Sequence, residues 1–563
     1  MQTRPPKFDA LQFERPDFDT LRERYTDLRA RLDAAQKPSE QVSVISEWNE
    51  LRRQLKSWTS LTHLKFNQDT SNEAFKQERE FSDEIQPKLT DLDSKIKEAI
   101  VGSPHRGDIE NTYGAHAFAL WQVALESFDI AIEEQEVEIN KLVAEYTSLR
   151  AAAEIEFDGE TYNLSQIAKF ATHADRDIRY RSQKATWDWV ASVGDELDRI
   201  FDRMVELRHQ EAQTLGFDNY VELGYKRMSR VDYNRHDVER FRDEVHRVIV
   251  PIAQKLVERQ REKLGVEEVM AWDLKVYDPR GNPAPDGDHD WMVERATEMF
   301  DELGDELGGF FRMMRDNNFL DLKARKNKSG GGFCTSFPQV RMPFVFANFN
   351  DTKHDVEVFT HEMGHAFQYW CASQQHELVD YNWPSYESAE IHSMSLEFLT
   401  WPHMERFFGD DAQRFREIHL LEGLTFLPYG VAVDHFQHMI YDNPTATPAE
   451  RKQMWREVRE RYLPWTDWGD IDYPANGGRW QLQSHIYHVP FYYIDYTLAQ
   501  TCAMQFWLRA EDDFDEAMTA YIALCKRGGS APFLELVESA GLTSPFEPGC
   551  LERVANRARE VLF

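Results

Sequence analysis

The stretch THEMGHAFQYW, residues 360–370, decides how this sequence is interpreted. It contains the HExxH pattern as His361-Glu362-Met363-Gly364-His365. On an α-helix, His361 and His365 lie one turn apart on the same face, so both imidazoles can bind one metal ion. Glu362 lies beside them, where its carboxylate can take a proton from a zinc-activated water molecule. The pattern predicts a zinc site with His361 and His365 as metal ligands and Glu362 as the general base.

A catalytic zinc ion normally has three protein ligands, and the fourth position stays open. Candidates for the third ligand lie downstream, in the helical pattern WPSYESAEIHSMSLEFLTW at 383–401. Glu387, Glu390 and Glu397 share one face of that helix at spacings that bring them together. Spacing does not choose between Glu387 and Glu390. We expect one of them to bind the metal, while another acid accepts the Nδ1–H of a ligand histidine.

The fold class predicted from periodicity is mainly α. Helical patterns cover residues 14 to about 150, 165 to 264, and most of the chain after Asp351. The stretch IEFDGETYNL at 155–164 predicts a hairpin that turns at Asp158-Gly159. The strongest strand signal is Phe344–Phe349. We expect this strand beside the HExxH helix, with an exposed edge to which an extended peptide can bind.

Composition excludes some classes of partner. The chain has 98 acidic and 65 basic residues and a formal charge of −33, so it has no large positive field to attract nucleic acid or an anionic membrane. The first residues lack the apolar stretch of a signal peptide, and no segment has the apolar length of a membrane span. The five cysteines are scattered and never paired as CxxC. They predict a reducing, cytoplasmic location.

A second group of candidate catalytic residues lies in HIYHVPFYYIDYTLA, residues 485–499. Peptide hydrolysis passes through an oxyanion that needs hydrogen-bond donors. His485, His488, Tyr493 and Tyr496 are the candidate donors. We expect Pro490 to open a helix that carries both tyrosines on one face, after a loop at 485–489.

These segments together resemble the M3 family of metallopeptidases, in particular its oligoendopeptidase F and Pz-peptidase branch. The resemblance rests on HEMGHAFQ at 361–368, SAEIHSMSLEF at 388–398 and the stretch at 485–499, and it extends over most of the chain from about Ile167. It implies that Glu390 is the third ligand and that Glu397 supports the ligands. It assigns contacts with the transition state most strongly to His485 and Tyr496. The family commonly has a histidine where this chain has Gln368.

The resemblance also implies a fold and an activity. The fold is that of a large helical zincin, with a small β-sheet beside the HExxH helix and a deep substrate channel between two helical halves, residues 1–200 and the catalytic half 201–563. The activity is that of an endopeptidase with one Zn²⁺ per chain, which hydrolyses internal bonds of short unstructured oligopeptides. Two alternatives remain open at this stage: a zinc carboxypeptidase of the helical HExxH type, and a non-catalytic peptide-binding protein. The sequence does not determine the oligomeric state.

Overall fold

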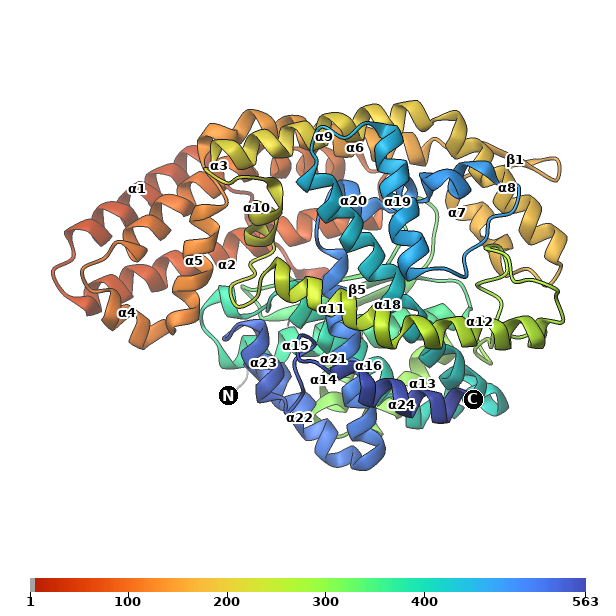
Figure 1. Cartoon of the computed structure of the whole chain (residues 1–563). Helices are drawn as coiled ribbons and strands as arrows, with labels where there is room; N and C mark the ends of the chain where they lie inside the picture. Colours follow the sequence, from red (N-terminus) through yellow and green to blue (C-terminus); the bar gives the residue numbers. More distant parts are fainter. Residues whose placement is uncertain (1–5) are drawn as a thin grey trace.

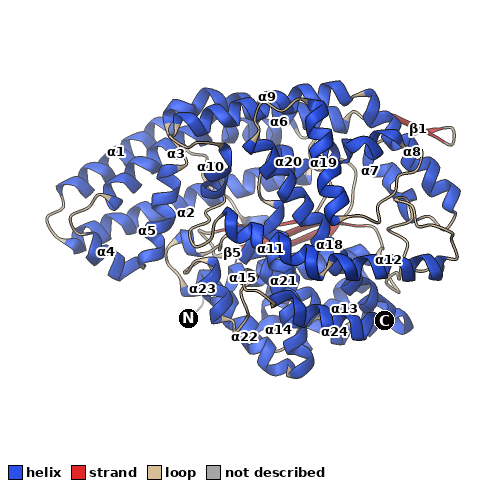
Figure 2. Ribbon diagram, in the orientation of Figure 1, coloured by secondary structure: helices blue, strands red, loops and turns tan. Residues whose placement is uncertain are grey.

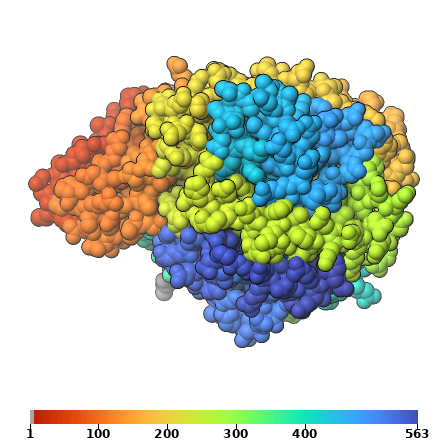
Figure 3. Space-filling view, in the orientation of Figure 1, coloured from red at the N-terminus to blue at the C-terminus, as the bar shows by residue number. Residues whose placement is uncertain are grey.

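The computed structural model describes residues 6–563, which form mostly helices (Figures 1 and 2). The first five helices form an N-terminal layer, the lobe that extends to the left in Figures 1 and 3. They are α1 (Phe18–Ala34), α2 (Pro38–Gln68), α3 (Glu73–Val101), α4 (Arg106–Tyr113) and α5 (Ala115–Glu126). The layer has a hydrophobic core of its own, built around Trp48, Ile96 and Trp121. Among residues 6–563, the buried members that this core takes from outside these helices are Leu378 and Tyr381.

A second group of elements follows the N-terminal layer. It consists of α6 (Glu133–Ala151), β1 (Ile155–Phe157), β2 (Glu160–Tyr162), α7 (Leu164–Ile167), α8 (Arg176–Ser192), α9 (Gly194–Thr214), α10 (Tyr220–Arg227), α11 (Arg235–Val248) and α12 (Val250–Leu264). Strands β1 and β2 pair antiparallel, and Asp158 and Gly159 have φ angles of 49° and 83°. Two positive φ angles are typical of a tight hairpin turn, so the hairpin prediction is confirmed.

The three-stranded sheet corrects one prediction. It contains β3 (Leu320–Lys323), β4 (Phe333–Phe337) and β5 (Met342–Phe349) in the order β3-β5-β4. The predicted edge strand, Phe344–Phe349, lies in β5 and is the central strand, while β4 is an edge. Nearly every residue of β5 is buried. A continuous apolar run of this kind is typical of a strand that is covered on both faces.

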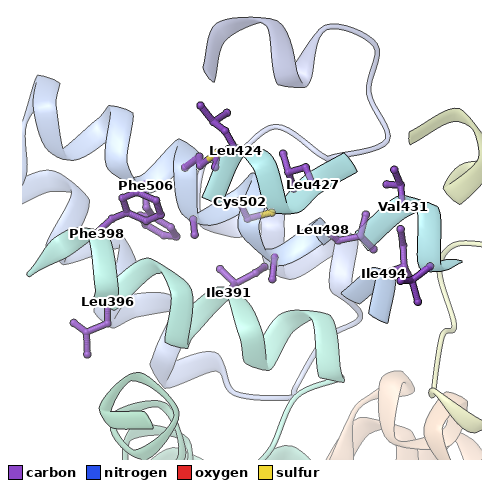
Figure 4. Close-up of a cluster of buried hydrophobic side chains, with 14 of the residues drawn as sticks. Ile391, Leu396, Phe398, Leu424, Leu427, Val431, Ile494, Leu498, Cys502 and Phe506 are labelled. Atoms are coloured by element: carbon purple, nitrogen blue, oxygen red, sulfur yellow. The ribbon is translucent and has the colours of Figure 1, made fainter. Parts of the chain in front are cut away.

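The remaining helices complete the molecule around this sheet. They are α13 (His289–Glu302), α14 (Asp305–Asp316), α15 (Lys353–Gln375), α16 (Tyr386–Leu399), α17 (Glu405–Phe408), α18 (Ala412–Asp442), α19 (Pro448–Tyr462), α20 (Ser484–His488), α21 (Tyr493–Asp512), α22 (Phe514–Arg527), α23 (Phe533–Ser539) and α24 (Cys550–Leu562). Helix α15 packs on β5, and α16 packs against both α15 and α21. Figure 4 shows Ile391, Leu427 and Leu498 meeting where α16, α18 and α21 pack together. No helix in residues 6–563 is long and apolar enough to cross a membrane.

The predicted boundary between residues 200 and 201 falls inside α9, where Ile200 and Phe201 are fully buried. Both belong to the larger hydrophobic cluster, which also includes Leu142 and Tyr146 of α6. The smaller cluster takes its buried residues mainly from α1–α5, although Leu61 and Leu64 of α2 belong to the larger one. A division into an N-terminal layer and a catalytic body thus follows the hydrophobic cores, whereas a boundary at residue 200 stays a prediction.

The N-terminal layer is joined to the catalytic body by a buried ion pair. Arg52 of α2 donates two hydrogen bonds to the carboxylate of Asp380, over 3.0 Å and 2.6 Å. The two side chains are only 6% and 16% exposed. Burial by itself raises the pKa of Asp380, but Arg52 outweighs that effect and holds the pKa well below its ordinary value.

We expect Asp380→Asn to lower the free energy of unfolding by about 3 kcal/mol at pH 7, because it leaves the buried guanidinium without its counter-charge. A carboxylate whose pKa is depressed in the folded state stabilises the fold above its unfolded pKa of about 4 and loses that contribution as the pH falls further. The difference between native protein and variant should therefore shrink below about pH 4. Denaturant titrations at several pH values measure this difference in the free energy of unfolding.

The matched control is Asp91→Asn, which removes an exposed ion pair with Lys95. It should lower the free energy of unfolding by about 0.5 kcal/mol or less. Equal losses in both variants would contradict the role given to Arg52 and Asp380.

Candidate metal centre

Helix α15 carries the HExxH residues, and its first turn is built as its sequence indicates. Thr352 is the N-cap, and the carboxylate of Asp355 accepts the backbone N–H groups of Thr352 and Asn350 over 3.1 Å and 2.8 Å. These bonds satisfy donors that a helix start otherwise leaves unpaired. The apolar residues Phe359 and Met363 are buried in the core. His361 and His365 are partly exposed and line a cavity.

Helix α16 lies unusually close to α15 at Gly364. A Cβ atom at this position would lie 2.6 Å from both the carbonyl oxygen of His392 and the Cα atom of Ser393. Any side chain would therefore collide with the α16 backbone, and only glycine allows the two helices this approach. The approach brings Glu390 of α16 to the two histidines of α15.

His361, His365 and Glu390 form a cluster whose candidate ligand atoms all lie within 4.8 Å of one another. The Nε2 atoms of His361 and His365 are 3.2 Å and 3.5 Å from Oε2 of Glu390. Two imidazole nitrogens and one carboxylate oxygen are a common protein ligand set of catalytic zinc. The residues present therefore fit a zinc ion with one position open to the cavity.

Hydrogen bonds fix the orientation of His361. Its Nδ1–H donates to Oε1 of Glu397 over 2.7 Å, and Oε2 of Glu397 accepts from Nε2 of His419 over 2.7 Å. The indole N–H of Trp401 in turn donates to Nδ1 of His419 over 3.2 Å. Because an indole nitrogen can only donate, His419 must donate through Nε2. The chain of bonds leaves the Nε2 lone pair of His361 free for the metal.

Glu390 is held from two sides. The hydroxyl of Tyr492 donates to its Oε1 over 2.8 Å, and the hydroxyl of Ser393 donates to its Oε2 over 3.0 Å. Burial raises the pKa of Glu390, but its contacts with His365 and His361 outweigh that effect and bring the pKa well below its ordinary value. The carboxylate is therefore ionised, as a metal ligand must be.

Glu362 has the surroundings of a general base. Its side chain is almost buried, and its Oε2 has no hydrogen-bond partner in residues 6–563. Burial raises its pKa, and the nearby histidines offset only part of that shift. A raised pKa brings the carboxylate closer to the range in which it can both take up and release a proton near neutral pH.

Glu387, the alternative left open by spacing, is not part of the cluster. It is buried, and burial together with the charge of Asp495 raises its pKa to about 8. Arg230 opposes that shift.

Gln368 is also buried and donates to the carbonyl of Asn382 over 3.1 Å. It holds the segment between α15 and α16, which gives this position a structural contact.

The segment at 485–499 differs in detail from its prediction. Residues 484–488 form the short helix α20, not a loop, and α21 begins at Tyr493. Pro490 lies in a turn, followed by Phe491 with a φ angle of 66°. This left-handed residue reverses the chain between α20 and α21, so Pro490 does not open the helix.

His485 and Tyr496 lie near the metal cluster. The His485 ring contacts the rings of Tyr493 and Tyr496, with centroids 5.1 Å and 5.9 Å apart. The amide of Gln483 donates to its Nδ1 over 2.9 Å, which leaves Nε2–H as a donor. Burial lowers the pKa of His485, so the ring is neutral at pH 7. Tyr496 lines the same cavity as the cluster.

Two predicted catalytic residues lie elsewhere. His488 is exposed, lies 3.3 Å from the hydroxyl of Thr147 and packs its ring against Tyr146 of α6. Tyr493 packs against Tyr429 of α18. Neither lines the cavity that contains the metal cluster, and His485 does not line it either. Tyr493 contacts both His485 and Tyr496, whereas His488 faces α6.

Sequence reasoning did not identify Tyr492, Ser393 or His419, although all three support the centre. Ser393 has a weak signal, since it lies three residues after Glu390 on the same helix. Tyr492 is one of four tyrosines in a short run, and spacing does not distinguish it. His419 lies on another helix and has no sequence signal, because only the fold brings α18 to Glu397.

The cavity above the cluster has a volume of about 740 Å³. Its walls include Phe333 and Cys334 of the edge strand β4, and Lys56 and Lys97 of the N-terminal layer. It therefore lies between the N-terminal layer and the catalytic body. A channel between two helical halves is what the resemblance to the M3 family implies.

Comparison with known proteins gives a consistent result. Residues 169–555 match the model of peptidase family M3, and residues 8–128 match the model of the peptidase M3 N-terminal domain. An oligoendopeptidase F homolog of Lactococcus lactis subsp. lactis (strain IL1403) is 22% identical over 405 residues, which cover 69% of this chain and 64% of that protein. The chain thus matches less than two thirds of the length of this curated relative.

Solved structures are similar over the whole chain. The structure described as Pz peptidase A with inhibitor 2 has a TM-score of 0.94 and 44% sequence identity, over 99% of both chains. A protein from Bacillus anthracis str. Ames, described as an oligoendopeptidase F, has a TM-score of 0.90 and 41% identity, over 100% of this chain and 98% of that one. The predicted fold class and the predicted family are confirmed.

We expect Glu397→Gln to weaken zinc binding by about 10- to 100-fold, because residues that orient a metal-binding histidine contribute that much to affinity. Competition with a chromophoric chelator measures the affinity, and circular dichroism checks the fold. The control Glu460→Gln removes an exposed carboxylate on α19 and should leave the affinity unchanged. Unchanged zinc affinity in Glu397→Gln would refute the supporting role.

We expect Gly364→Ala to destabilise the protein by about 1–3 kcal/mol and to reduce its zinc content, because the added methyl group separates α15 from α16. Gly309→Ala in α14 is the matched control, since a Cβ atom there meets nothing within 4 Å. It should be neutral or stabilising by up to about 1 kcal/mol. Thermal unfolding and metal analysis compare the two. A Gly364→Ala protein with full zinc content would show that the helices can separate without loss of the site.

Proposed function

Because the chain belongs to peptidase family M3, we propose that it is a zinc-dependent endopeptidase that hydrolyses internal bonds of short, unstructured oligopeptides. One observation carries the proposal: the cluster of His361, His365 and Glu390 opens into the same cavity as the buried carboxylate of Glu362. Metal binding alone does not require Glu362, whereas hydrolysis requires a base at that place. This argues against a purely peptide-binding role.

His361, His365 and Glu390 would hold the zinc ion, one per chain. When bound, zinc supplies Lewis acidity, which polarises the peptide carbonyl and makes water a stronger nucleophile. Glu362 takes the proton from the attacking water and then delivers it to the leaving amine. Its raised pKa suits both halves of this transfer.

His485 and Tyr496 would stabilise the developing oxyanion. His485 has its Nε2–H free, because its Nδ1 already accepts from Gln483. Burial raises the pKa of Tyr496, so its hydroxyl keeps its proton and remains a donor. Tyr492 has a different role, since its hydroxyl already donates to Glu390. It positions a ligand and leaves the oxyanion to the other two groups.

The cavity supports oligopeptides as the substrate class. Strand β4 pairs only with β5, so one of its edges is free within the sheet, and Phe333 and Cys334 bring that strand to the cavity. An extended peptide can bind along such an edge as an added strand. A space bounded by the N-terminal layer on one side favours flexible chains over folded proteins. All five cysteines are unpaired, which supports the proposed cytoplasmic location.

One observation favours the carboxypeptidase alternative. Lys56 lines the metal cavity and has no carboxylate within 4.0 Å among residues 6–563. A cation at this place could anchor the C-terminal carboxylate of a peptide. The two activities differ in their substrates, because a carboxypeptidase does not cut a peptide whose C-terminus is blocked.

We expect the native protein with zinc to cut an internally quenched peptide that is acetylated and amidated at its ends. Glu362→Gln should bind about one zinc per chain, as a single site of this type predicts, and lose at least about 10³-fold in kcat, because the base acts only in the reaction. Metal analysis and fluorescence assays measure both. Native protein that binds zinc but cuts only unblocked peptides would favour the carboxypeptidase, and native protein without zinc would refute the site.

A further inference from the structure

A second cavity, of about 530 Å³, lies outside the site described above and shares no lining residue with the metal cavity. It is lined by residues of α6, α7, α8, α12, α18 and α19 and of the segments at 271–277, 463–468 and 479–482. Five of the chain's 15 tryptophans line it. A large aromatic cavity of this size is typical of a ligand site.

The same cavity is lined by four cations, namely Arg150, Lys275, Arg459 and Arg479. None of the four has a carboxylate within 4.0 Å in the described chain, residues 6–563. Elsewhere several buried arginines are paired with carboxylates, as Arg179 with Asp273 and Arg230 with Asp495. In the cavity, Arg150, Arg459 and Arg479 are partly buried and Lys275 is exposed. Cations gathered around one cavity repel one another. Four of them around one cavity, in a chain of formal charge −33, are a local exception.

The chain offers these cations little compensation. Arg459 donates one hydrogen bond to the carbonyl of Ala475 over 2.9 Å, and Arg479 packs over the ring of Tyr429. Lys275 is accessible from the cavity, yet the surrounding protein and the charge of Arg479 lower its pKa. The acid that opposes this shift is Glu422, which is already paired with Lys353 over 2.6 Å. The cavity therefore presents positive charge that an anionic ligand would neutralise.

A short path connects the cavity to the proposed catalytic residues. Tyr429 lines the cavity, and its hydroxyl donates to Gln483 over 2.7 Å. Gln483 donates in turn to His485 over 2.9 Å. The Tyr429 ring also packs on Tyr493, which contacts Tyr496 of the metal cavity. The second cavity is thus linked through side-chain contacts to the proposed oxyanion donors.

We infer that this cavity binds a carboxylate of the oligopeptide substrate, several residues away from the scissile bond. The inference rests on the proposed function, and it adds the substrate class: peptides with an anionic group at a fixed distance from the cleaved bond. Arginine side chains bind carboxylates through paired hydrogen bonds, and the tryptophans pack against the neighbouring peptide residues. The carboxylate is that of the C-terminus or of a Glu or Asp side chain.

The test uses the zinc-loaded protein and internally quenched peptides with one common scissile core. One series of peptides varies in length, and each length is made with a free and with an amidated C-terminus. In a second series every peptide is amidated and carries a single Glu at one of several successive positions. At the matching length we expect kcat/KM for the anionic peptide to exceed that of its neutral counterpart by about tenfold. In Lys275→Met and Arg479→Gln, the ratio of kcat/KM for the anionic peptide to kcat/KM for its neutral counterpart should fall close to one.

Controls locate the effect. Lys141→Met removes an exposed lysine outside the cavity, and it should keep both the activity and the ratio. If Lys56→Met abolishes the ratio while Lys275→Met keeps it, the carboxylate binds in the metal cavity and the inference is overturned. A native protein without any preference at any length or Glu position overturns it as well. A preference for free C-termini identifies the terminal carboxylate, and a preference for one Glu position identifies a side chain.

Binding measurements separate this inference from the proposed function. If the native protein cuts none of the peptides, fluorescence anisotropy with zinc-loaded Glu362→Gln measures binding directly. Tighter binding of the anionic peptides, lost in Lys275→Met, would support the cavity's role although endopeptidase activity had failed. Equal binding of anionic and neutral peptides would overturn the inference whatever the activity. Circular dichroism and thermal unfolding of each variant confirm that the fold is intact.

Discussion

The close approach of α15 and α16 at Gly364 is the constraint on which the centre depends. The backbone of α16 lies where a side chain of residue 364 would be, so the two helices are closer here than any residue with a side chain would allow. His361 and His365 come from one helix and Glu390 from the other. A shift of a few tenths of an ångström between the helices would separate the carboxylate from the imidazoles. The site is therefore as rigid as the core beneath it, which α21 and α18 complete (Figure 4).

A network of buried polar groups surrounds this contact. Glu397 accepts hydrogen bonds from both His361 and His419, and Tyr492 donates one to Glu390. These bonds fix the orientation of the two imidazole rings and of the Glu390 carboxylate. Such networks cost desolvation energy and are stable only when their members are paired. Some members are not paired: among the described residues, Oε2 of Glu362 and Nδ1 of His365 have no hydrogen-bond partner. A buried carboxylate oxygen without a hydrogen-bond donor lowers the stability of the fold. The same oxygen is free to accept a proton, as a general base must.

Charge is distributed unevenly over the molecule. The formal charge of −33 keeps the protein away from polyanions, while unpaired cations line both cavities, Lys56 in one and the four cations in the other. The negative net charge disfavours nucleic acid at the surface, whereas the unpaired cations of the cavities would attract single carboxylates. The N-terminal layer, with its own core and its buried Arg52–Asp380 attachment, forms one wall of the metal cavity. It can restrict access without contributing to the metal cluster.

The sequence by itself determined the helical class, the hairpin at 155–162 and the two histidines of the metal cluster, because these depend on spacing along a single helix or on a local turn. Spacing alone left Glu387 and Glu390 open, and only the resemblance to a family separated them. Tertiary structure decided the rest: that Phe344–Phe349 is a central strand, that His488 faces α6, and that His419 and Tyr492 support the centre. It also brought four cations from distant segments around one cavity. These features depend on contacts between elements far apart in the chain, and local periodicity carries no record of such contacts.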